Sequence, residues 1–308
     1  MSVIVLSTGC SVPLPEATAN APAISSVDET EQSKQLTPDQ VLVLGDISSN
    51  PTRKIEQYQP LAAYLQRHLT DVGIERTVVK IAPDLETMQT WVDSGEVDLY
   101  FDSPYPVMVI SNNTGAEPIL RRWKEGIGEY HSIIFALKNR DIQSVTDLRN
   151  ARIALETDFS TSGYMLPFAY LQNAGFNLVK QPSEATVLQS NDIGFLFSSG
   201  EDNTIELVLS GKVDAGAVDS GTFSALPESV RSSLTIVLET ESVARHIVLA
   251  STEMPVDQTE ATRNLLLQMH ESVDGQTVLE SFENTAKFDE FPVDASIERL
   301  EELYNQTL

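Results

Sequence analysis

The chain has 308 residues, a hydrophobic content of 41% and a formal net charge of −25, from 45 acidic and 20 basic residues. Length and hydrophobic content suffice for two ordinary domains with buried cores. A chain this acidic gains nothing from the release of counterions by a polyanion, which excludes nucleic acids and anionic membrane surfaces as expected partners.

The amino terminus carries the single cysteine, Cys10, so no intrachain disulfide can form. A short apolar run and small residues precede it, and residues 1–10 therefore resemble the end of a bacterial lipoprotein signal whose cysteine is lipidated. No basic residue precedes the run, and Ser7 stands where such signals usually have Leu, so an accidental apolar start remains an alternative.

Residues 11–38 are rich in Pro, Ala, Ser, Thr and acidic residues and have little to bury. We interpret them as a flexible tether. A lipidated Cys10 followed by a tether predicts a periplasmic or cell-surface protein that is anchored to the membrane.

The segment after the tether is expected to alternate between strand and helix. Apolar residues recur with a helical period in two windows, and short apolar runs bounded by polar residues flank them. Strands are predicted at residues 41–45, 77–81 and 97–101, and helices at 58–69 and 85–92. This order is typical of a mostly parallel sheet covered by helices, with a polar turn at residues 102–106.

A second α/β series follows, and the chain is expected to cross a hinge twice. Extended apolar segments near residues 132–138 and 240–250 join the two halves. In between, we predict strands at 152–155, 184–187 and 213–218 and helices at 146–148, 163–174 and 203–210; helices at 259–272 and 295–304 follow. We assign residues 39–133 and 245–308 to lobe 1 and residues 134–244 to lobe 2.

Three consecutive hydroxyl residues, Ser160, Thr161 and Ser162, separate the predicted strand 152–155 from the helix 163–174. A helix start offers backbone N–H groups without intrahelical acceptors and the positive end of the helix dipole. The hydroxyls add further donors, so this segment could bind a small oxyanion. The alternative is an ordinary helix cap. Ser103 also follows a predicted strand, and ligands of such sheets bind beyond the carboxyl ends of the strands.

Several short motifs follow one another in a fixed order along residues 40–300: Tyr58-Gln59-Pro60-Leu61, Gly95-Glu96-Val97-Asp98, Ser103-Pro104-Tyr105, Tyr130-His131-Ser132, Asp147-Leu148-Arg149, Ser160-Thr161-Ser162-Gly163 and Gly211-Lys212-Val213-Asp214-Ala215-Gly216-Ala217. In this order they resemble the substrate-binding proteins of bacterial phosphonate, phosphite and phosphate ABC importers. The resemblance implies an α/β fold of two lobes, the type II periplasmic-binding-protein clamshell, which closes on a small oxyanion. It also implies an ABC permease and ATPase as partners, no cofactor, and a monomer.

The resemblance assigns the site residue by residue. The hydroxyls of residues 160–162 would grip the oxyanion from lobe 2. Tyr130 would line the cleft, and the loop with Ser103 and Tyr105 would face the ligand from lobe 1.

The sequence departs from the family pattern in three respects. Gly200-Glu201 stands where the phosphonate binders have Gly-His, and Leu85 replaces a tyrosine. Gly221 and Arg245 replace acidic groups that bind a substrate amine. We therefore expect the site to disfavour aminoalkyl phosphonates and to suit a ligand with a second negative or polar group.

The roles of three candidate residues remain open. Arg245 would reach the ligand or pair with an acidic residue on the lobe surface. Glu201 would accept a proton from the oxyanion or face water. Asp219, just after the strand 213–218, is a further candidate of undecided role.

Two other classes of function could use an α/β chain of this length. An enzyme is not expected, because the chain has no nucleophile elbow, P-loop, HExxH motif or Cys/His zinc spacing, and His131 is the only histidine beside the predicted site. A ligand sensor that docks on a signalling receptor would use the same fold and remains the alternative to an importer component.

Overall fold

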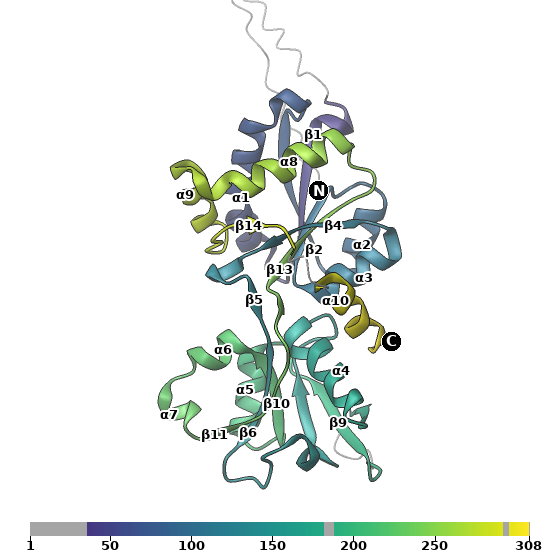
Figure 1. Cartoon of the computed structure of the whole chain (residues 1–308), viewed down its shortest axis with the longest axis vertical. Coiled ribbons are helices and arrows are strands. Elements are labelled where there is room, and N and C mark those ends of the chain that lie inside the picture. Colours follow the sequence, from purple (N-terminus) through teal and green to yellow (C-terminus); the bar gives the residue numbers. More distant parts are fainter. Residues whose placement is uncertain (1–35, 182–187, 292–295, 308) are drawn as a thin grey trace, which may run out of the picture. The chain divides into compact units, whose positions relative to one another are not determined.

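Two mixed β-sheets organise the computed structural model, which describes residues 36–181, 188–291 and 296–307. Cys10, residues 11–35 of the expected tether and the expected strand at 184–187 lie outside the described residues. Residues 36–308 form one compact unit. We name the part built on the first sheet lobe 1 and the part built on the second sheet lobe 2 (Figure 1).

The first sheet has six strands in the order β14-β4-β13-β3-β1-β2. Their bounds are β1 Val41–Ile47, β2 Arg76–Ala82, β3 Leu99–Asp102, β4 Glu117–Arg122, β13 His246–Ala250 and β14 Phe288–Asp289. The strands β2, β1 and β3 run parallel to one another, whereas β13 is antiparallel to both β3 and β4. The predicted parallel βαβαβ start of the chain is therefore present, and β13 brings a distant segment into its sheet.

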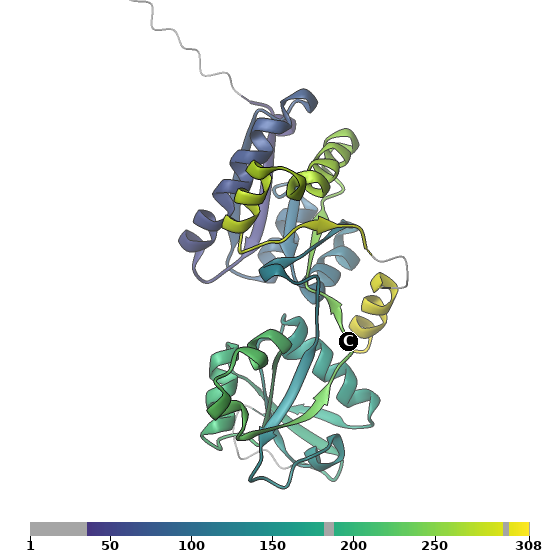
Figure 2. The same cartoon turned by 60° about the vertical axis from the view of Figure 1, so that its left-hand side comes forward.

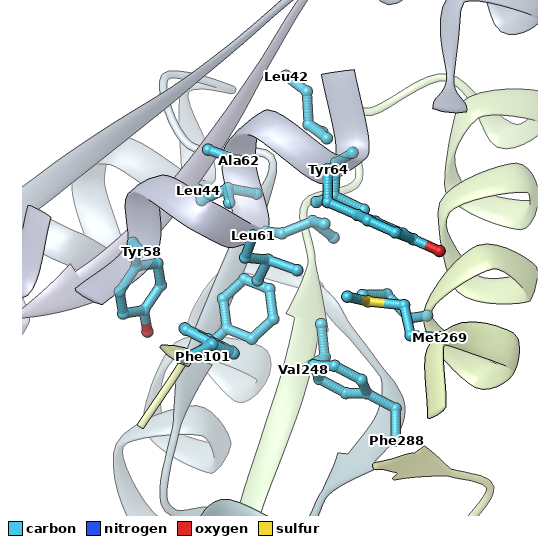
Figure 3. Close-up of a cluster of buried hydrophobic side chains, with 14 of the residues drawn as sticks. Leu42, Leu44, Tyr58, Leu61, Ala62, Tyr64, Phe101, Val248, Met269 and Phe288 are labelled. Atoms are coloured by element: carbon cyan, nitrogen blue, oxygen red, sulfur yellow. The ribbon is translucent and has the colours of Figure 1, made fainter. Parts of the chain in front are cut away.

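Helices cover both faces of the first sheet. One face carries α1 (Pro51–His68), α8 (Val256–Gln268) and α9 (Val273–Ser281), and the other carries α2 (Leu85–Asp93) and α3 (Pro104–Thr114). Alternate strand residues point to opposite faces, so Phe101 packs under α1 while its neighbour Tyr100 packs toward α2 and α3. Figure 3 shows the first of these clusters, in which Tyr58 and Leu61 of α1 lie over strand side chains.

The second sheet also has six strands, in the order β11-β6-β10-β7-β9-β8. Their bounds are β6 Ser132–Leu137, β7 Arg152–Leu155, β8 Asn177–Lys180, β9 Asp192–Phe197, β10 Ala215–Asp219 and β11 Leu234–Glu239. Its helices are α4 Leu166–Asn173, α5 Glu201–Leu209, α6 Ser220–Ala225 and α7 Glu228–Arg231. The central strands β10, β7, β9 and β8 are parallel, and β6 is antiparallel to β10.

The chain passes between the sheets at two strands that pair with each other, β5 (Glu129–Tyr130) and β12 (Val243–Ala244). Figure 2 shows both crossings from a second side. The carboxyl-terminal helix α10 (Ser296–Asn305) contacts α3 of lobe 1, α4 of lobe 2 and β12. A hydrophobic cluster with members in both lobes lies here; it includes Tyr105, Met165, Leu166, Leu300 and Leu303.

Short helical turns complete the chain: η1 Pro38–Gln40, η2 Thr70–Val72, η3 Lys124–Gly126, η4 Val145–Leu148, η5 Thr161–Met165 and η6 Met269–Glu271. The turn η5 is π-helical and continues directly into α4, so residues 161–173 are one helical segment. This segment begins with the hydroxyl residues singled out from the sequence.

Candidate functional site

A cavity of about 230 Å³ lies at the carboxyl ends of strands from both sheets. Lobe 2 contributes the residues after β7 and β10 and the start of α5, and lobe 1 contributes the residues at the end of β3 and the start of β13. This is the edge at which α/β sheets bind ligands.

Ser160 forms the cap of the helical segment η5–α4. Its hydroxyl accepts a hydrogen bond from the amide of Gly163 at 2.9 Å and donates one to Glu156 Oε2 at 2.7 Å. The carbonyl of Gly163 in turn accepts from the amide of Glu156. A Cβ atom at position 163 would lie 2.8 Å from Glu156 Oε2, so only glycine permits this close approach. The helix start and Glu156 are thereby fixed against each other.

Thr161 and Ser162 follow the cap and line the cavity. Both are buried, and their amides precede the first intrahelical hydrogen bond, which leaves these N–H groups available to a ligand. The carbonyl of Ser162 accepts a hydrogen bond from the hydroxyl of Ser132 at the start of β6. The positive end of the helix dipole points into the cavity together with these donors.

Lobe 1 faces this helix start with the start of α3. Ser103 is the cap residue of α3 and lines the cavity. The amide of Tyr105 donates a 2.8 Å hydrogen bond to Thr161 Oγ1. The ring of Tyr105 instead packs against Tyr164 and Tyr304, away from the lining.

Tyr130 and Arg245 lie on the two crossing segments. Burial raises the pKa of Tyr130 to about 12, although the nearby Arg245 acts in the opposite direction. The Arg245 guanidinium lies 4.6 Å from the centre of the Tyr130 ring, a cation–π contact. It also pairs with Glu125 at 2.8 Å. Arg245 therefore combines the two alternatives derived from the sequence, because it lines the cavity and also pairs with an acidic residue.

Glu201 and Asp219 lie at the starts of α5 and α6 and share one partner, Thr222. Asp219 caps α6 by accepting from the Thr222 amide at 2.8 Å. Glu201 accepts from the Asp219 amide and from the Thr222 hydroxyl, both at 2.7 Å. Burial and then the charge of Asp219 raise the pKa of Glu201 to about 7. The carboxylate of Glu201 is thus turned toward α6 rather than toward open solvent.

The structure brings together nearly all residues that the sequence predicted for the site. Ser103, Tyr130 and the run 160–162 line the cavity, as do Glu201, Asp219 and Arg245. Tyr105 contributes its amide rather than its side chain.

Other lining residues were missed in the sequence: Asp102, Glu156, Thr157, Phe159 and His246. Asp102 ends β3 and Glu156 follows β7 directly, so the rule about carboxyl ends of strands could have identified both. His246 lines the cavity where the sequence pointed to His131. His246 could not be recognised, because β13 reaches the site only through long-range pairing with β3 and β4.

The cavity lining carries more negative charge than the sequence suggested for an oxyanion site. Four carboxylates line it, from Asp102, Glu156, Glu201 and Asp219, whereas Arg245 is its single lining Lys or Arg. These four carboxylates could pair with a substrate amine although Gly221 and Arg245 are not acidic, so the lining does not disfavour amine-bearing ligands.

Within the part of the chain that the structure describes, no group of three or more His, Cys, Asp and Glu residues could hold a metal ion. The same residues include no helix that is both long enough and apolar enough to cross a membrane.

Solved structures share the fold. XAC2383 from Xanthomonas citri, solved bound to chloride ion, is 28% identical with a TM-score of 0.80, covering 87% of this chain and 97% of its own. It has also been solved bound to ATP. PhnD1 from Prochlorococcus marinus, in complex with methylphosphonate, is 18% identical with a TM-score of 0.65, covering 87% and 98%. The aliphatic sulphonate binding protein SsuA from Escherichia coli is 15% identical with a TM-score of 0.56, covering 86% of each chain.

No curated protein sequence matches the chain. The family profile described as ABC transporter, phosphonate, periplasmic substrate-binding protein matches residues 47–295. The resemblance stated from the sequence and the predicted two-lobed fold with two crossings are thereby confirmed. The family consists of extracytoplasmic binding components of importers rather than enzymes, and this favours an importer component over a sensor. The chain belongs to the family of periplasmic substrate-binding proteins of phosphonate ABC transporters.

Proposed function

We propose that the protein binds a small tetrahedral oxyanion of the phosphonate, phosphite or phosphate type and delivers it to an ABC permease and its ATPase. The observation that carries this proposal is the start of the helical segment η5–α4, where Thr161 and Ser162 line the cavity and their amides precede the first intrahelical hydrogen bond. Helix starts with free N–H groups bind such anions in many proteins. Relatives of the fold support an anionic ligand, since XAC2383 has been solved with chloride and PhnD1 with methylphosphonate.

The size of the cavity favours a compact ligand. Its volume of about 230 Å³ is below the roughly 300–1,000 Å³ of cavities that hold drug-sized molecules. A phosphonate with a short substituent suits this volume better than a nucleotide such as the ATP bound to XAC2383.

We assign roles to the remaining site residues on the basis of their contacts. Arg245 would balance part of the negative charge of the cavity and contact the substituent of the ligand. Tyr130 would hold the Arg245 guanidinium in place through its ring. Glu201 and Asp219 would shape the wall at α6, since their oxygens already accept from protein donors.

We further propose that the two lobes close on the ligand by a hinge movement at β5 and β12. The lobe limits expected from the sequence were residues 39–133 with 245–308, and residues 134–244. The second crossing supports the expected limit between residues 244 and 245, because β12 ends at Ala244 and β13 starts at His246. The first crossing favours a limit slightly before the expected one between residues 133 and 134, because the lobe 2 strand β6 already begins at Ser132. A closed form would present a composite surface for the permease.

Lipidation of Cys10, with residues 11–38 as a tether, is the proposed means of attachment at the outer face of the membrane. The proposal is supported by the extracytoplasmic location of the family and by the apolar run before Cys10. We propose a monomer, as expected for a soluble body that docks on a permease. Metabolic labelling with a fatty acid tests the anchor: Cys10→Ala should lose the label and move to the soluble fraction. Equal membrane association of both proteins would contradict it.

The ligand proposal is tested by calorimetric titration with methylphosphonate, phosphite, phosphate and chloride. Each hydrogen bond to a charged group contributes about 1.5–3 kcal/mol, so replacing Ser160, Thr161 and Ser162 together with Ala should weaken oxyanion binding at least about a hundredfold. Ser162→Ala alone is the milder variant that leaves the Ser160 cap intact. Unchanged affinity in the triple variant would refute the assigned site.

A further inference from the structure

The carboxylates of the cavity differ in how their oxygens are occupied. Asp102 accepts hydrogen bonds on both oxygens, from the Ser103 amide and from the Tyr100 hydroxyl. Both donors belong to the same turn at the end of β3, so this carboxylate is held by its own loop. Each oxygen of the Asp102 carboxylate thus accepts a hydrogen bond from the protein without a ligand.

Glu201 and Asp219 are also engaged with protein donors. The two oxygens of Glu201 accept from the Asp219 amide and the Thr222 hydroxyl. Asp219 accepts from the Thr222 amide on one oxygen, and its second oxygen lies 3.2 Å from the Thr222 hydroxyl, whose single proton is donated to Glu201 at the shorter distance. These two carboxylates therefore stabilise the start of α6.

Glu156 differs from the other three carboxylates in its position, because it is held against Ser160, the cap of the helical segment η5–α4. Its Oε2 accepts from the hydroxyl of Ser160, but among the described residues no donor contacts its Oε1. The carboxylate lines the cavity immediately beside the helix start, because Gly163 allows it to approach closely. An oxyanion bound at the amides of Thr161 and Ser162 would therefore have the free oxygen of Glu156 as a neighbour.

Two neighbouring negative oxygens, one of the carboxylate and one of the oxyanion, repel each other unless a proton lies between them. Sulfate and sulfonates carry no proton near neutral pH, whereas phosphate-type oxyanions lose their second proton in this range. A ligand with a P–OH group could donate that proton to Glu156, and the repulsion would become a hydrogen bond to a charged acceptor.

We propose that Glu156 determines specificity by requiring a hydrogen-bond donor on the bound oxyanion, so that the site accepts singly protonated phosphorus oxyanions and rejects sulfate and alkylsulfonates. This inference deepens the proposed function and rests on it. It concerns a residue that the sequence pattern did not single out, and it separates the chain from sulfonate-binding proteins of the same fold such as SsuA.

The charged groups around Glu156 favour the same conclusion. Burial raises the pKa of Glu156; Asp219 at the start of α6 and Asp102 at the end of β3 act in the same direction, while the Ser160 hydroxyl and Arg245 lower it. Tyr130, Glu201 and His246 line the same cavity. A proton shared between Glu156 and the ligand would relieve the repulsion, whichever of the two carries it. Affinity for a phosphonate should fall as rising pH removes this proton, and sulfate should gain affinity at acid pH once Glu156 is protonated.

The test compares methylphosphonate, phosphate and sulfate by calorimetry at several pH values between 5.5 and 8.5, in the full chain. We expect wild-type protein at pH 7.5 to bind sulfate at least about a hundredfold more weakly than phosphate. Glu156→Gln offers an N–H donor in place of the free oxygen, so it should bind sulfate at least about tenfold more tightly than wild type and lose most of the pH dependence. Aminomethylphosphonate is a fourth ligand in this comparison. Its ammonium group can donate to Glu156 in place of the P–OH proton, so its binding should depend less on pH.

Matched variants separate this effect from general loss of charge or fold. Asp158→Asn removes an exposed carboxylate two residues away that does not line the cavity, and it should leave selectivity unchanged. Glu156→Asp keeps the carboxylate and should keep the rejection of sulfate even if the fold is weakened. If wild type binds sulfate as tightly as phosphate, or if Glu156→Gln keeps wild-type selectivity, the inference is wrong while the proposed function stands. If no phosphorus oxyanion binds wild type, the proposed function fails and the inference fails with it.

Discussion

The backbone amide of Tyr105 donates a 2.8 Å hydrogen bond to the hydroxyl of Thr161, which joins the start of α3 in lobe 1 to the start of η5 in lobe 2. Tyr105 stands between Pro104 and Pro106, which have no N–H, so its amide is the only donor among the first three residues of α3. The hydroxyl of Thr161 accepts from this amide and can direct its own proton toward a ligand. This hydrogen bond would couple the proposed closure of the lobes to the orientation of a ligand donor at one side chain.

Thr161→Val should weaken oxyanion binding by roughly ten- to a hundredfold, because one hydrogen bond to a charged group contributes about 1.5–3 kcal/mol. Valine has a similar shape and fits a site that is only 1% exposed, but it leaves the Tyr105 amide without its acceptor, so the variant should fold with a free energy of unfolding lower by about 1–3 kcal/mol. Thr161→Ser keeps the hydroxyl and should bind nearly as wild type does. Titration calorimetry measures both, and equal affinity of the Val variant and wild type would show that this hydroxyl does not contact the ligand.

Arg245 is the single Lys or Arg of the cavity lining, and Arg245→Gln should therefore reduce affinity for anionic ligands. The reduction should be larger for a phosphonate whose substituent carries a second negative group than for methylphosphonate. Glu125→Gln is the matched control, since it removes the exposed partner of Arg245 without changing the lining. The Glu125 side chain is 57% exposed and water screens its pair with Arg245, so this control should change affinity only a few-fold. Equal losses for both ligands in Arg245→Gln would assign the arginine a structural role.

Much of lobe 1 and the hydroxyl run could be predicted from local patterns. The alternation of apolar strands and helical windows identified β1, α1 and β2, and residues 160–162 were recognised by their position before a helix. The helix α3 was not recognised, because Pro104 and Pro106 are typical of a turn; in the structure both lie in the first turn of the helix, where an N–H is not needed.

The unpredicted features depend on tertiary contacts. The meeting of Glu201 with Asp219 requires α5 and α6 to start side by side, and no local pattern records this. The free oxygen of Glu156 follows from the close approach that Gly163 permits. A sequence reveals which residues carry charge, but their hydrogen-bond partners determine which charge remains available to a ligand.

Glu283 forms ion pairs with three cations of lobe 1, the buried Arg122 and the half-buried Lys54 and Lys124, and its removal should be strongly destabilising. Its carboxylate contacts Lys54 at 2.8 Å, Arg122 at 3.1 Å and Lys124 at 3.7 Å. Glu283→Gln would leave Lys54 with Asp46 as its remaining partner but would remove the carboxylate that pairs with Arg122 and Lys124. Removing one partner of a buried ion pair typically costs about 3–5 kcal/mol. Denaturant unfolding measures the loss. Glu290→Gln, a change of an exposed carboxylate, is the control and should cost less than about 1 kcal/mol.

Glu283 should also make the free energy of unfolding depend on pH in the acid range. Burial alone would raise the pKa of Glu283, but Arg122, Lys124 and Lys54 overcome this and lower it to about 2. Because the folded pKa lies below the unfolded value, the stabilisation is complete above the unfolded value and is lost as pH falls toward the folded one. Wild type should therefore lose this contribution between about pH 4.5 and pH 2, whereas the Gln variant should show a shallower loss over that range. Parallel acid profiles for the two proteins would contradict the assignment.

The carboxyl-terminal helix α10 should control how easily the lobes separate. Its Leu300 and Leu303 are buried in the hydrophobic cluster that also contains Tyr105 of lobe 1 and Leu166 of lobe 2. Arg299 of the same helix pairs with Glu241 beside the second crossing. Opening the lobes would have to separate some of these contacts, although the sequence suggested that residues 245–308 belong to lobe 1 alone.

Replacing Leu300 and Leu303 together with Ala removes buried side chains that each stabilise by about 2–5 kcal/mol. Some of this energy holds the lobes together, so the variant should have a larger radius of gyration without ligand, a weaker affinity, and a return toward the wild-type radius on saturation with methylphosphonate. Small-angle scattering and calorimetry measure these changes. Glu301→Ala alters an exposed residue of the same helix and should change neither quantity. If the double variant unfolds at a lower temperature but keeps the wild-type radius and affinity, α10 stabilises the fold without influencing closure, and the hinge at β5 and β12 sets the equilibrium alone.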